Sequence, residues 1–427
     1  MDFVFLLIYI LLFFFFLLYY LKWKKNFDAG AVVVSLYLVY AVFGMLLFYD
    51  KNSMENIDFQ YFSIKIFPLL YLFVCLIISF SPILLFKSKS YKGIEPPAFN
   101  LDLFACFFIL CFVLQIGKIF SHLSSGLYLV LFVDDGTTEL YGQMSDNASE
   151  GGKGISNILS IFANMLYGFG VLMFYYYLTL NKKKKWIIWG LGIGILIGIF
   201  EYAASGQRGG MIKRSLVLIS TYFLFKDYLN VKTNKIIKMV GLSIVSFMAV
   251  VFMAMSISRF GEREGGVVSS INRYAGQAVL NFDRYAFDNN GIRYGDRVFP
   301  VFKKILQFSN VPDNYIERRA KYPYLHINDE VFVTFVGDFC FDFGPIIAFL
   351  IILLFTIWVR SKTKSNRTFY PFHKLILLQF CMNIIIQGGS LFPYADTGNL
   401  IMITYFLLYV FFLLAYSNRR YATTQNV

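Results

Sequence analysis

The chain has 427 residues, of which 58% are hydrophobic, 20% are aromatic and only 15% are charged. This composition excludes a soluble fold, which has no interior large enough for so much apolar surface, and indicates an integral membrane protein. The formal net charge of +13 lies mostly in short segments beside the apolar runs, so membrane topology explains it better than nucleic-acid binding does.

Eleven apolar stretches have about the length that a helix needs to cross the hydrocarbon core of a bilayer. They are predicted at residues 3–21, 29–49, 63–86, 99–119, 155–180, 186–204, 211–229, 236–257, 331–359, 371–388 and 398–417. The expected fold is therefore an all-α integral membrane protein with about 11 transmembrane helices.

Basic segments follow every second predicted span. They lie at residues 22–25, 87–92, 182–185, 226–238, 360–374 and 419–420. Because cytoplasmic loops are enriched in Lys and Arg, all six are assigned to the inside, with the N-terminus outside and the C-terminus cytoplasmic. This topology predicts a transmembrane bundle at 1–257 (spans 1 to 8), an external Arg-rich loop subdomain at 258–330, and spans 9 to 11 with a cytoplasmic tail at 331–427.

Lysine and arginine divide unequally across this topology. The inner segments hold 17 Lys and 4 Arg, whereas the outside holds 8 Lys and 10 Arg, eight of them within residues 258–330. The planar Arg side chain binds a phosphate through two hydrogen bonds, so Arg259 and Arg263, just past the span 236–257, are predicted to meet a lipid-linked diphosphate. The same loop holds nine acidic residues, so a self-paired charged surface is the alternative for any one of its arginines.

Other residue types have a structural explanation. Gly190, Gly194 and Gly198 share one face of the span 186–204, which predicts close helix packing. The five Cys all lie in apolar stretches, and the three His show no paired spacing. Neither a metal site nor a cofactor is therefore expected.

A short glycine turn, residues 205–210 (SGQRGG), joins the spans 186–204 and 211–229. Its glycines let the backbone approach a ligand, and the amides that open the next helix point outward with a positive dipole. Arg208 and Arg214 are therefore predicted to bind an anion at the outer membrane face, with Glu201 as a candidate partner. The alternative is a plain turn whose Arg208 reaches lipid phosphate.

The long external segment ends with His326, Asp329 and Glu330, just before the span 331–359. A histidine beside two carboxylates can take a proton from a sugar hydroxyl near neutral pH, so these three are predicted to be catalytic. The alternative is a surface histidine that caps the following helix together with Asp329.

Asp338 and Asp342 are four residues apart, so they lie on one face of the span 331–359. Carboxylates are costly inside a membrane unless they are paired, so each is predicted to meet an arginine or to line a wet cavity, as a structural partner or as part of the substrate site. Gly344 and Pro345 predict a kink that would expose Asp342 further.

The last outer loop, residues 387–398, contains Asp396 and is predicted to form a lid or wall of the site, or simply to connect two spans. Several tyrosines are candidates for stacking on sugar rings, although Tyr is enriched at any membrane interface. They are Tyr315, Tyr322, Tyr324 and Tyr394.

Three of these features together resemble the Wzy-type oligosaccharide repeat-unit polymerases of O-antigen and capsular polysaccharide, which are related to the O-antigen ligases. They are the layout of many spans with one long external loop, the glycine turn around Arg208, and the helix sequence 337–345 (GDFCFDFGP). The resemblance covers most of the chain in layout and implies a GT-C-like bundle.

The resemblance implies metal-independent glycosyl transfer at the outer face of the bacterial plasma membrane. A growing glycan would pass from undecaprenyl diphosphate to the next lipid-linked repeat unit, with arginines stabilising the leaving diphosphate. Arg208 matches the short-turn arginine, and Arg284 with Gly295 fits an Arg-to-Gly spacing of some members. His326 and Asn328 differ from the His-Asn pair of the ligases by one inserted residue, so Asp329 or Glu330 could be the base instead.

The implied partners are a polyprenyl-diphosphate-linked oligosaccharide, membrane lipid, and a chain-length regulator and a flippase of the same pathway; nucleic acid is not expected. An O-antigen ligase is one alternative function, because it shares the machinery. A lipid-linked oligosaccharide flippase or a transporter is another, but it would need charge through a central cavity and usually two similar halves.

Overall fold

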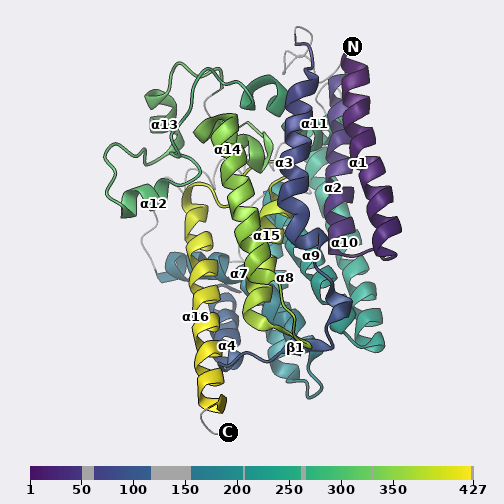
Figure 1. Cartoon of the computed structure of the whole chain (residues 1–427), viewed down its shortest axis with the longest axis vertical. Helices are drawn as coiled ribbons and strands as arrows, with labels where there is room; N and C mark the ends of the chain where they lie inside the picture. The colour runs from purple at the N-terminus through teal and green to yellow at the C-terminus, as the bar shows by residue number, and fades with distance from the viewer. Residues whose placement is uncertain (51–61, 117–154, 205–206, 261–265, 328–330, 425–427) are drawn as a thin grey trace. The chain divides into compact units, whose positions relative to one another are not determined.

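A computed structural model describes residues 1–50, 62–116, 155–204, 207–260, 266–327 and 331–424 (Figure 1). The regular secondary structure of these residues is helical, apart from one pair of three-residue strands. The predicted all-α class is confirmed. The chain divides into two compact units, each built from separate parts of the sequence. The three consecutive stretches proposed from topology stay a prediction.

Eight helices among the described residues are long and apolar enough to cross a membrane. They are Asp2–Lys24, Ala29–Phe48, Ile66–Ser90, Leu159–Thr179, Lys185–Tyr202, Val231–Ile257, Thr334–Thr363 and Asp396–Ser417. Each coincides with a predicted span. The three other predicted spans fall on α4 (Leu101–Val113) and α15 (Phe372–Gln387), which are shorter, and on α9 (Arg208–Phe225), which carries three cationic side chains. The number eleven therefore stays a prediction.

Unit 1 comprises Met1–Phe86, Val268–Lys364 and Phe380–Ile403. It holds α1 (Asp2–Lys24), α2 (Ala29–Phe48), α3 (Ile66–Leu84), most of α11 (Gly266–Asn281), a π-helical turn (Phe282–Ala286), α12 (Pro300–Ile305), α13 (Tyr315–Lys321), α14 (Thr334–Thr363), the end of α15, the 3₁₀ turn Asp396–Gly398 and the start of α16 (Asn399–Thr424).

Helices of unit 1 pack closely where small residues allow it. Helix α1 packs on α2, and α3 packs on α14. A Cβ atom on Gly276 of α11 would collide with the backbone of Phe43 in α2, so glycine is required for this approach. The Tyr37 hydroxyl of α2 donates a hydrogen bond to the Ile385 carbonyl at 2.9 Å, which ties α2 to α15.

Helix α14 is broken at Gly344, whose φ of 75° and ψ of 161° are not helical. Pro345 follows and has no N–H to continue the helical ladder. The Tyr71 hydroxyl of α3 donates to the Pro345 carbonyl at 2.5 Å, so a neighbouring helix satisfies a group at the break. The predicted kink is confirmed. The predicted exposure of Asp342 is wrong, because this side chain stays fully buried.

Unit 2 comprises Lys87–Val267, Ser365–Gln379 and Thr404–Val427. It holds the 3₁₀ turns Ser88–Ser90 and Lys226–Tyr228, the parallel strands β1 (Gly93–Glu95) and β2 (Phe369–Pro371), α4, α7 (Ile155–Thr179), α8 (Lys185–Ala204), α9, α10 (Val231–Phe260), the start of α15 and most of α16.

The glycine face of α8 packs against side chains of α4. A Cβ atom on Gly194 would lie 3.1 Å from the Phe108 ring and one on Gly190 would crowd Ile109, whereas one on Gly198 would meet Arg214 of α9 and Tyr167 of α7 before Phe112. Close packing at these three glycines is thus confirmed, and the groups that approach them are large side chains rather than a backbone.

Candidate functional site

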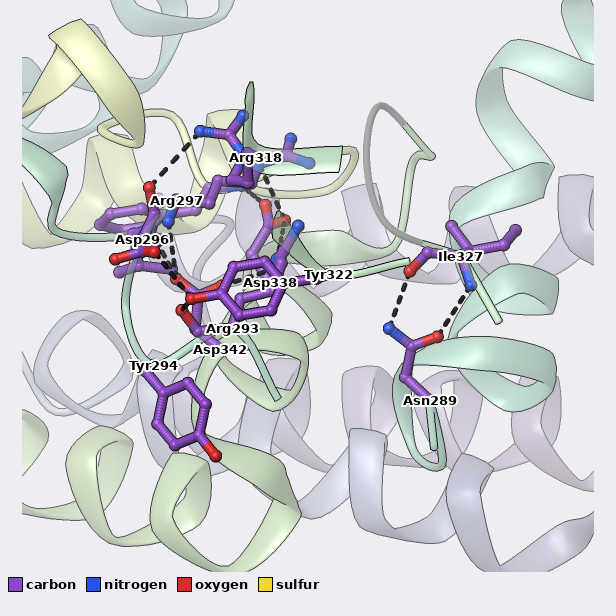
Figure 2. A network of polar contacts seen from close by, with 12 residues as sticks. Asn289, Arg293, Tyr294, Asp296, Arg297, Arg318, Tyr322, Ile327, Asp338 and Asp342 are labelled. Carbon is purple, nitrogen blue, oxygen red and sulfur yellow. Dashed lines mark hydrogen bonds and ion pairs between the residues drawn. The ribbon is translucent and has the colours of Figure 1, made fainter. Parts of the chain in front are cut away.

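A buried network in unit 1 joins Asp338 and Asp342 of α14 to two arginines of the long loop. The Nε atom of Arg293 lies 2.7 Å from Oδ1 of Asp342, and Nε of Arg297 lies 3.4 Å from Oδ1 of Asp338. Figure 2 shows the four side chains converging. Both aspartates and Arg293 have no exposed surface. Of the two alternatives predicted for these aspartates, pairing with arginine is the one that the structure shows.

The second oxygen of each aspartate accepts backbone hydrogen bonds. Oδ2 of Asp342 accepts from the N–H groups of Arg297, at 3.1 Å, and Val298, at 2.7 Å. Oδ2 of Asp338 accepts from the N–H group of Phe392 at 2.6 Å. The two carboxylates thus fasten the 293–298 turn and the last outer loop to α14. A substrate-binding role for them stays a prediction.

Asp296 forms a second charged cluster beside this network. It pairs with Lys303, accepts a hydrogen bond from Lys321 at 2.6 Å, and lies 2.7 Å from the Tyr322 hydroxyl. Burial alone would raise the pKa of Asp296, but the hydrogen bonds from these three donors outweigh it and lower the pKa. Burial and the bond to Asp296 raise the pKa of Tyr322.

The last outer loop packs on the same turn through Asp396. Its carboxylate accepts a hydrogen bond from Nη1 of Arg318 at 2.6 Å, and its N–H group donates to the Arg297 carbonyl at 3.0 Å. Asn399 at the start of α16 donates to the Val298 carbonyl at 2.8 Å. The loop is thus more than a connection, since it closes around the network. Whether it is also a wall of the substrate site stays a prediction.

The four tyrosines proposed for sugar stacking differ in exposure. Tyr322 is buried against Asp296, and Tyr394 is buried with its ring stacked on Phe380 at 5.2 Å. Tyr315 and Tyr324 are exposed. Of the four, only these two are exposed enough for a glycan to reach, and sugar stacking by them stays a prediction.

His326 is exposed on a segment that asparagines hold in place. The side chain of Asn289 donates to the Ile327 carbonyl at 2.7 Å and accepts from its N–H group at 2.9 Å (Figure 2). Asn290 donates to the Tyr324 carbonyl at 3.1 Å. The imidazole is therefore accessible on an anchored backbone. Asp329 and Glu330 lie outside the described residues, so capping of His326 by Asp329 and the choice of base stay predictions.

Asp283 and Arg284 lie in the π-helical turn Phe282–Ala286. The Arg284 guanidinium lies over the rings of Phe62 and Tyr285, with its Cζ atom 5.6 and 4.8 Å from their centroids. The Asp283 carboxylate is buried and accepts the Lys65 N–H at 3.0 Å, at the start of α3. Burial raises the pKa of Asp283 from 3.8 to about 7.

The raised pKa of Asp283 predicts a pH-dependent stability. The folded state binds this proton more tightly than the unfolded state, so folding stability falls as the pH rises from about 4 to about 7. We expect Asp283→Asn, which stays neutral and still accepts the Lys65 N–H, to become progressively more stable than wild type across that window. Thermal unfolding in detergent at several pH values measures this. Asp288→Asn, at an exposed carboxylate, is the control, and a pH-independent difference for Asp283→Asn would contradict the assignment.

Arg208 is the first residue of α9 in unit 2. Its Nη1 atom donates to the Ser256 hydroxyl of α10 at 2.6 Å, its Cζ atom lies 5.5 Å from the centre of the Phe252 ring, and the residue is 7% exposed. The N–H groups that open a helix have no partner within it and favour an anion. In α9 these N–H groups belong to Arg208, Gly209 and Gly210. A guanidinium, the positive end of a helix dipole and two glycines therefore lie at the same place.

Arg214, two turns along α9, has partners on two other helices. Its guanidinium donates to the Gly198 carbonyl at 2.6 Å and to Asn164, and it lies 3.7 Å from the Glu201 carboxylate. Its Cζ atom also lies 4.3 Å from the centre of the Tyr167 ring. Glu201, proposed as a partner at the Arg208 site, thus pairs with Arg214. These contacts make Arg214 a link among α7, α8 and α9, and its role in substrate binding stays a prediction.

Two of the loop arginines that were predicted to meet a diphosphate remain. Arg259 lies in the last turn of α10, and Arg263 lies outside the described residues.

Sequence reasoning missed Ser256 and Asn289, for which no signal beyond a polar residue type was available. It also missed which arginines pair with the aspartates. Arg293 and Arg297 have the same spacing of four as Asp338 and Asp342, but they lie in a turn rather than a helix, so this spacing does not indicate the pairing.

Within the part of the chain that the structure describes, no group of three His, Cys, Asp or Glu side chains is arranged to hold a metal ion. The features that predict an anion site, namely a guanidinium, a glycine pair and a helix N-terminus, lie in unit 2 at the start of α9, and anion binding there stays a prediction.

The fold defines an all-helical, multi-pass integral membrane protein with buried arginines in both of its units. A model of the O-antigen polysaccharide polymerase Wzy family matches residues 1–283, about two thirds of the chain. The chain therefore belongs to this family. No curated protein and no solved structure matches the chain. Membership confirms the resemblance and implies a polymerase that acts by glycosyl transfer on lipid-linked oligosaccharide in the membrane. The matched region includes Arg208 and Arg214 and ends before the Arg293 network.

Proposed function

We propose that the protein polymerises undecaprenyl-diphosphate-linked oligosaccharide repeat units into O-antigen or capsule at the outer face of the bacterial plasma membrane. The observation that carries the proposal is Arg208, anchored by Ser256 at the positive end of α9 inside the family-matched region. In this reaction the bond between the anomeric carbon and the diphosphate oxygen breaks, and the diphosphate leaves with the electron pair. Charge develops on that oxygen, where a preorganised guanidinium stabilises it most.

The acceptor side of the reaction needs a base. A sugar hydroxyl of the next repeat unit forms the new bond to the anomeric carbon, and its proton passes to a protein group. His326 is the candidate, because it is exposed and its segment is held by Asn289. Asp329 or Glu330 is the alternative base. Arg259, Arg263 and Arg284 are proposed as further contacts to the diphosphate or glycan, and no metal ion is needed for these steps.

Substitutions at His326 and at Asn289, which holds its segment, test the assignment of the acceptor base. We expect His326→Ala to lower polymerisation by about 10²–10³-fold, within the range for loss of a general base, and to remove the fall in rate toward acidic pH that protonation of such a base causes. Asn289→Ala should lower the rate less and leave the shape of the pH profile unchanged, because it only loosens the segment. An unchanged pH profile in His326→Ala would assign the base elsewhere.

Reconstitution tests the proposed function as a whole. The purified protein in liposomes, given undecaprenyl-diphosphate-linked repeat units, should produce a ladder of longer lipid-linked glycans and free undecaprenyl diphosphate. A ligase would lengthen nothing and would require a lipid A core acceptor. A flippase would move the substrate between leaflets without changing it. Either of these two results would replace the proposal.

A further inference from the structure

An apolar cavity of about 420 Å³ lies between α8 and α10 in unit 2. Its lining includes Leu196, Ile199 and Phe200 from α8 and Met239, Ile244 and Met248 from α10. Of the lining side chains in the described part of the chain only Ser243 is polar, and its hydroxyl donates back to the Met239 carbonyl at 3.1 Å. The cavity therefore suits a hydrocarbon and gives a polar ligand nothing to bind.

The cavity leads toward Arg208 along one face of α10. Ile244, Met248, Phe252 and Ser256 follow one another at intervals of four residues, so they line one side of the helix. The first two border the cavity, and the last two contact the Arg208 guanidinium. Ser256 lies eight residues beyond Met248, which is about 12 Å along the helix. One continuous face thus runs from hydrocarbon lining to a buried cation.

The opposite wall shows the same order. Phe200 of α8 lines the cavity, and its ring contacts the ring of Phe247 on α10 with 5.9 Å between centroids. The next residue, Glu201, pairs with Arg214. On α8 the lining is thus followed by the partner of Arg214, and on α10 it is followed eight residues later by Ser256, the partner of Arg208; both arginines belong to α9.

This order matches a molecule with an anionic head and a long hydrocarbon tail. We propose that the cavity between α8 and α10 binds the isoprenoid tail of the lipid carrier, with the diphosphate at Arg208. The inference rests on the proposed function and assigns a separate part of the same substrate to it. Acyl chains of bulk phospholipid share the tail chemistry, so the experiment must distinguish the two.

Two neighbouring substitutions on α10 provide the kinetic test. Ile244→Trp fills the cavity, whereas Val245→Trp adds the same bulk on a side chain that is exposed and outside the lining. Each is assayed with the repeat unit on undecaprenyl diphosphate and on single-isoprene (dimethylallyl) diphosphate, whose tail is too short to reach the cavity. We expect Ile244→Trp to raise KM about tenfold, equivalent to roughly 1.4 kcal/mol, for the long-tailed substrate only. Val245→Trp should leave both substrates unaffected.

Photolabelling of the wild type gives an independent readout. A polyprenyl diphosphate with a tail diazirine should label lining residues of α8 and α10, and undecaprenyl diphosphate should compete while phosphatidylethanolamine should not. Equal effects of the two Trp variants, or labelling displaced by phosphatidylethanolamine, would overturn the tail assignment and leave the proposed polymerisation intact. If the wild type made no polymer from the long-tailed substrate and none from the short-tailed one, that result would instead refute the proposed function.

Discussion

Arg208→Ala is expected to lower the polymerisation rate by about 10²–10³-fold, the typical loss when one preorganised donor to a developing anion is removed. The variant should insert and fold, because α9 also packs on α7 and α8 and keeps the contacts of Arg214 with both helices. Cells or liposomes should therefore accumulate single lipid-linked repeat units instead of polymer. Gel analysis of the lipid-linked glycans measures this directly.

Arg208→Lys separates charge from geometry. Lysine keeps the positive charge but loses the planar fork that binds two phosphate oxygens, so an intermediate rate is expected. Arg273→Ala, at an exposed arginine of α11, serves as the matched control and should polymerise normally. Long chains at the normal rate from both Arg208 variants would eliminate this arginine as the diphosphate contact.

Asp342→Ala should have the largest effect on stability. It leaves the guanidinium of Arg293 fully buried without its nearest carboxylate, and it removes the acceptor of two backbone N–H groups. Removing one partner of a buried ion pair costs about 3–5 kcal/mol. The 293–298 turn should detach from α14, which lowers the thermal midpoint in detergent and makes the loop sensitive to protease.

Two further variants define the cause of this loss. Asp313→Ala breaks the exposed pair with Lys304 and should cost less than about 1 kcal/mol. The double variant Arg293→Met with Asp342→Leu removes both buried charges and should recover part of the stability. If Asp342→Ala were as stable as Asp313→Ala, the network would not be what holds the turn on α14.

Helix positions could be predicted from the sequence because a membrane span needs a long apolar run, and that pattern is local. The break at Gly344 and Pro345 was predictable for the same reason, since proline acts on its own helix. Prediction was weakest where a helix is short or charged. Helix α9 carries Arg208 and Arg214, and their partners Ser256 and Asn164 lie on other helices that no local pattern identifies.

The candidate site was only partly predictable. That Asp338 and Asp342 would need arginines follows from the cost of burying a charge, which is independent of fold. Which arginines they meet depends on how the loop returns to α14, and that path is decided by long-range contacts such as the Phe392 N–H to Asp338. The order from apolar cavity to cation along α10 likewise becomes visible only when α8 and α10 are seen together.

The most direct test of the account is a structure of the full chain in a lipid nanodisc with a non-hydrolysable polyprenyl diphosphate analogue. A phosphate is expected within hydrogen-bonding distance of the Arg208 guanidinium and of the N–H groups that open α9. A diphosphate that lies away from Arg208 and from the start of α9 would contradict the assignment of Arg208 as the diphosphate contact.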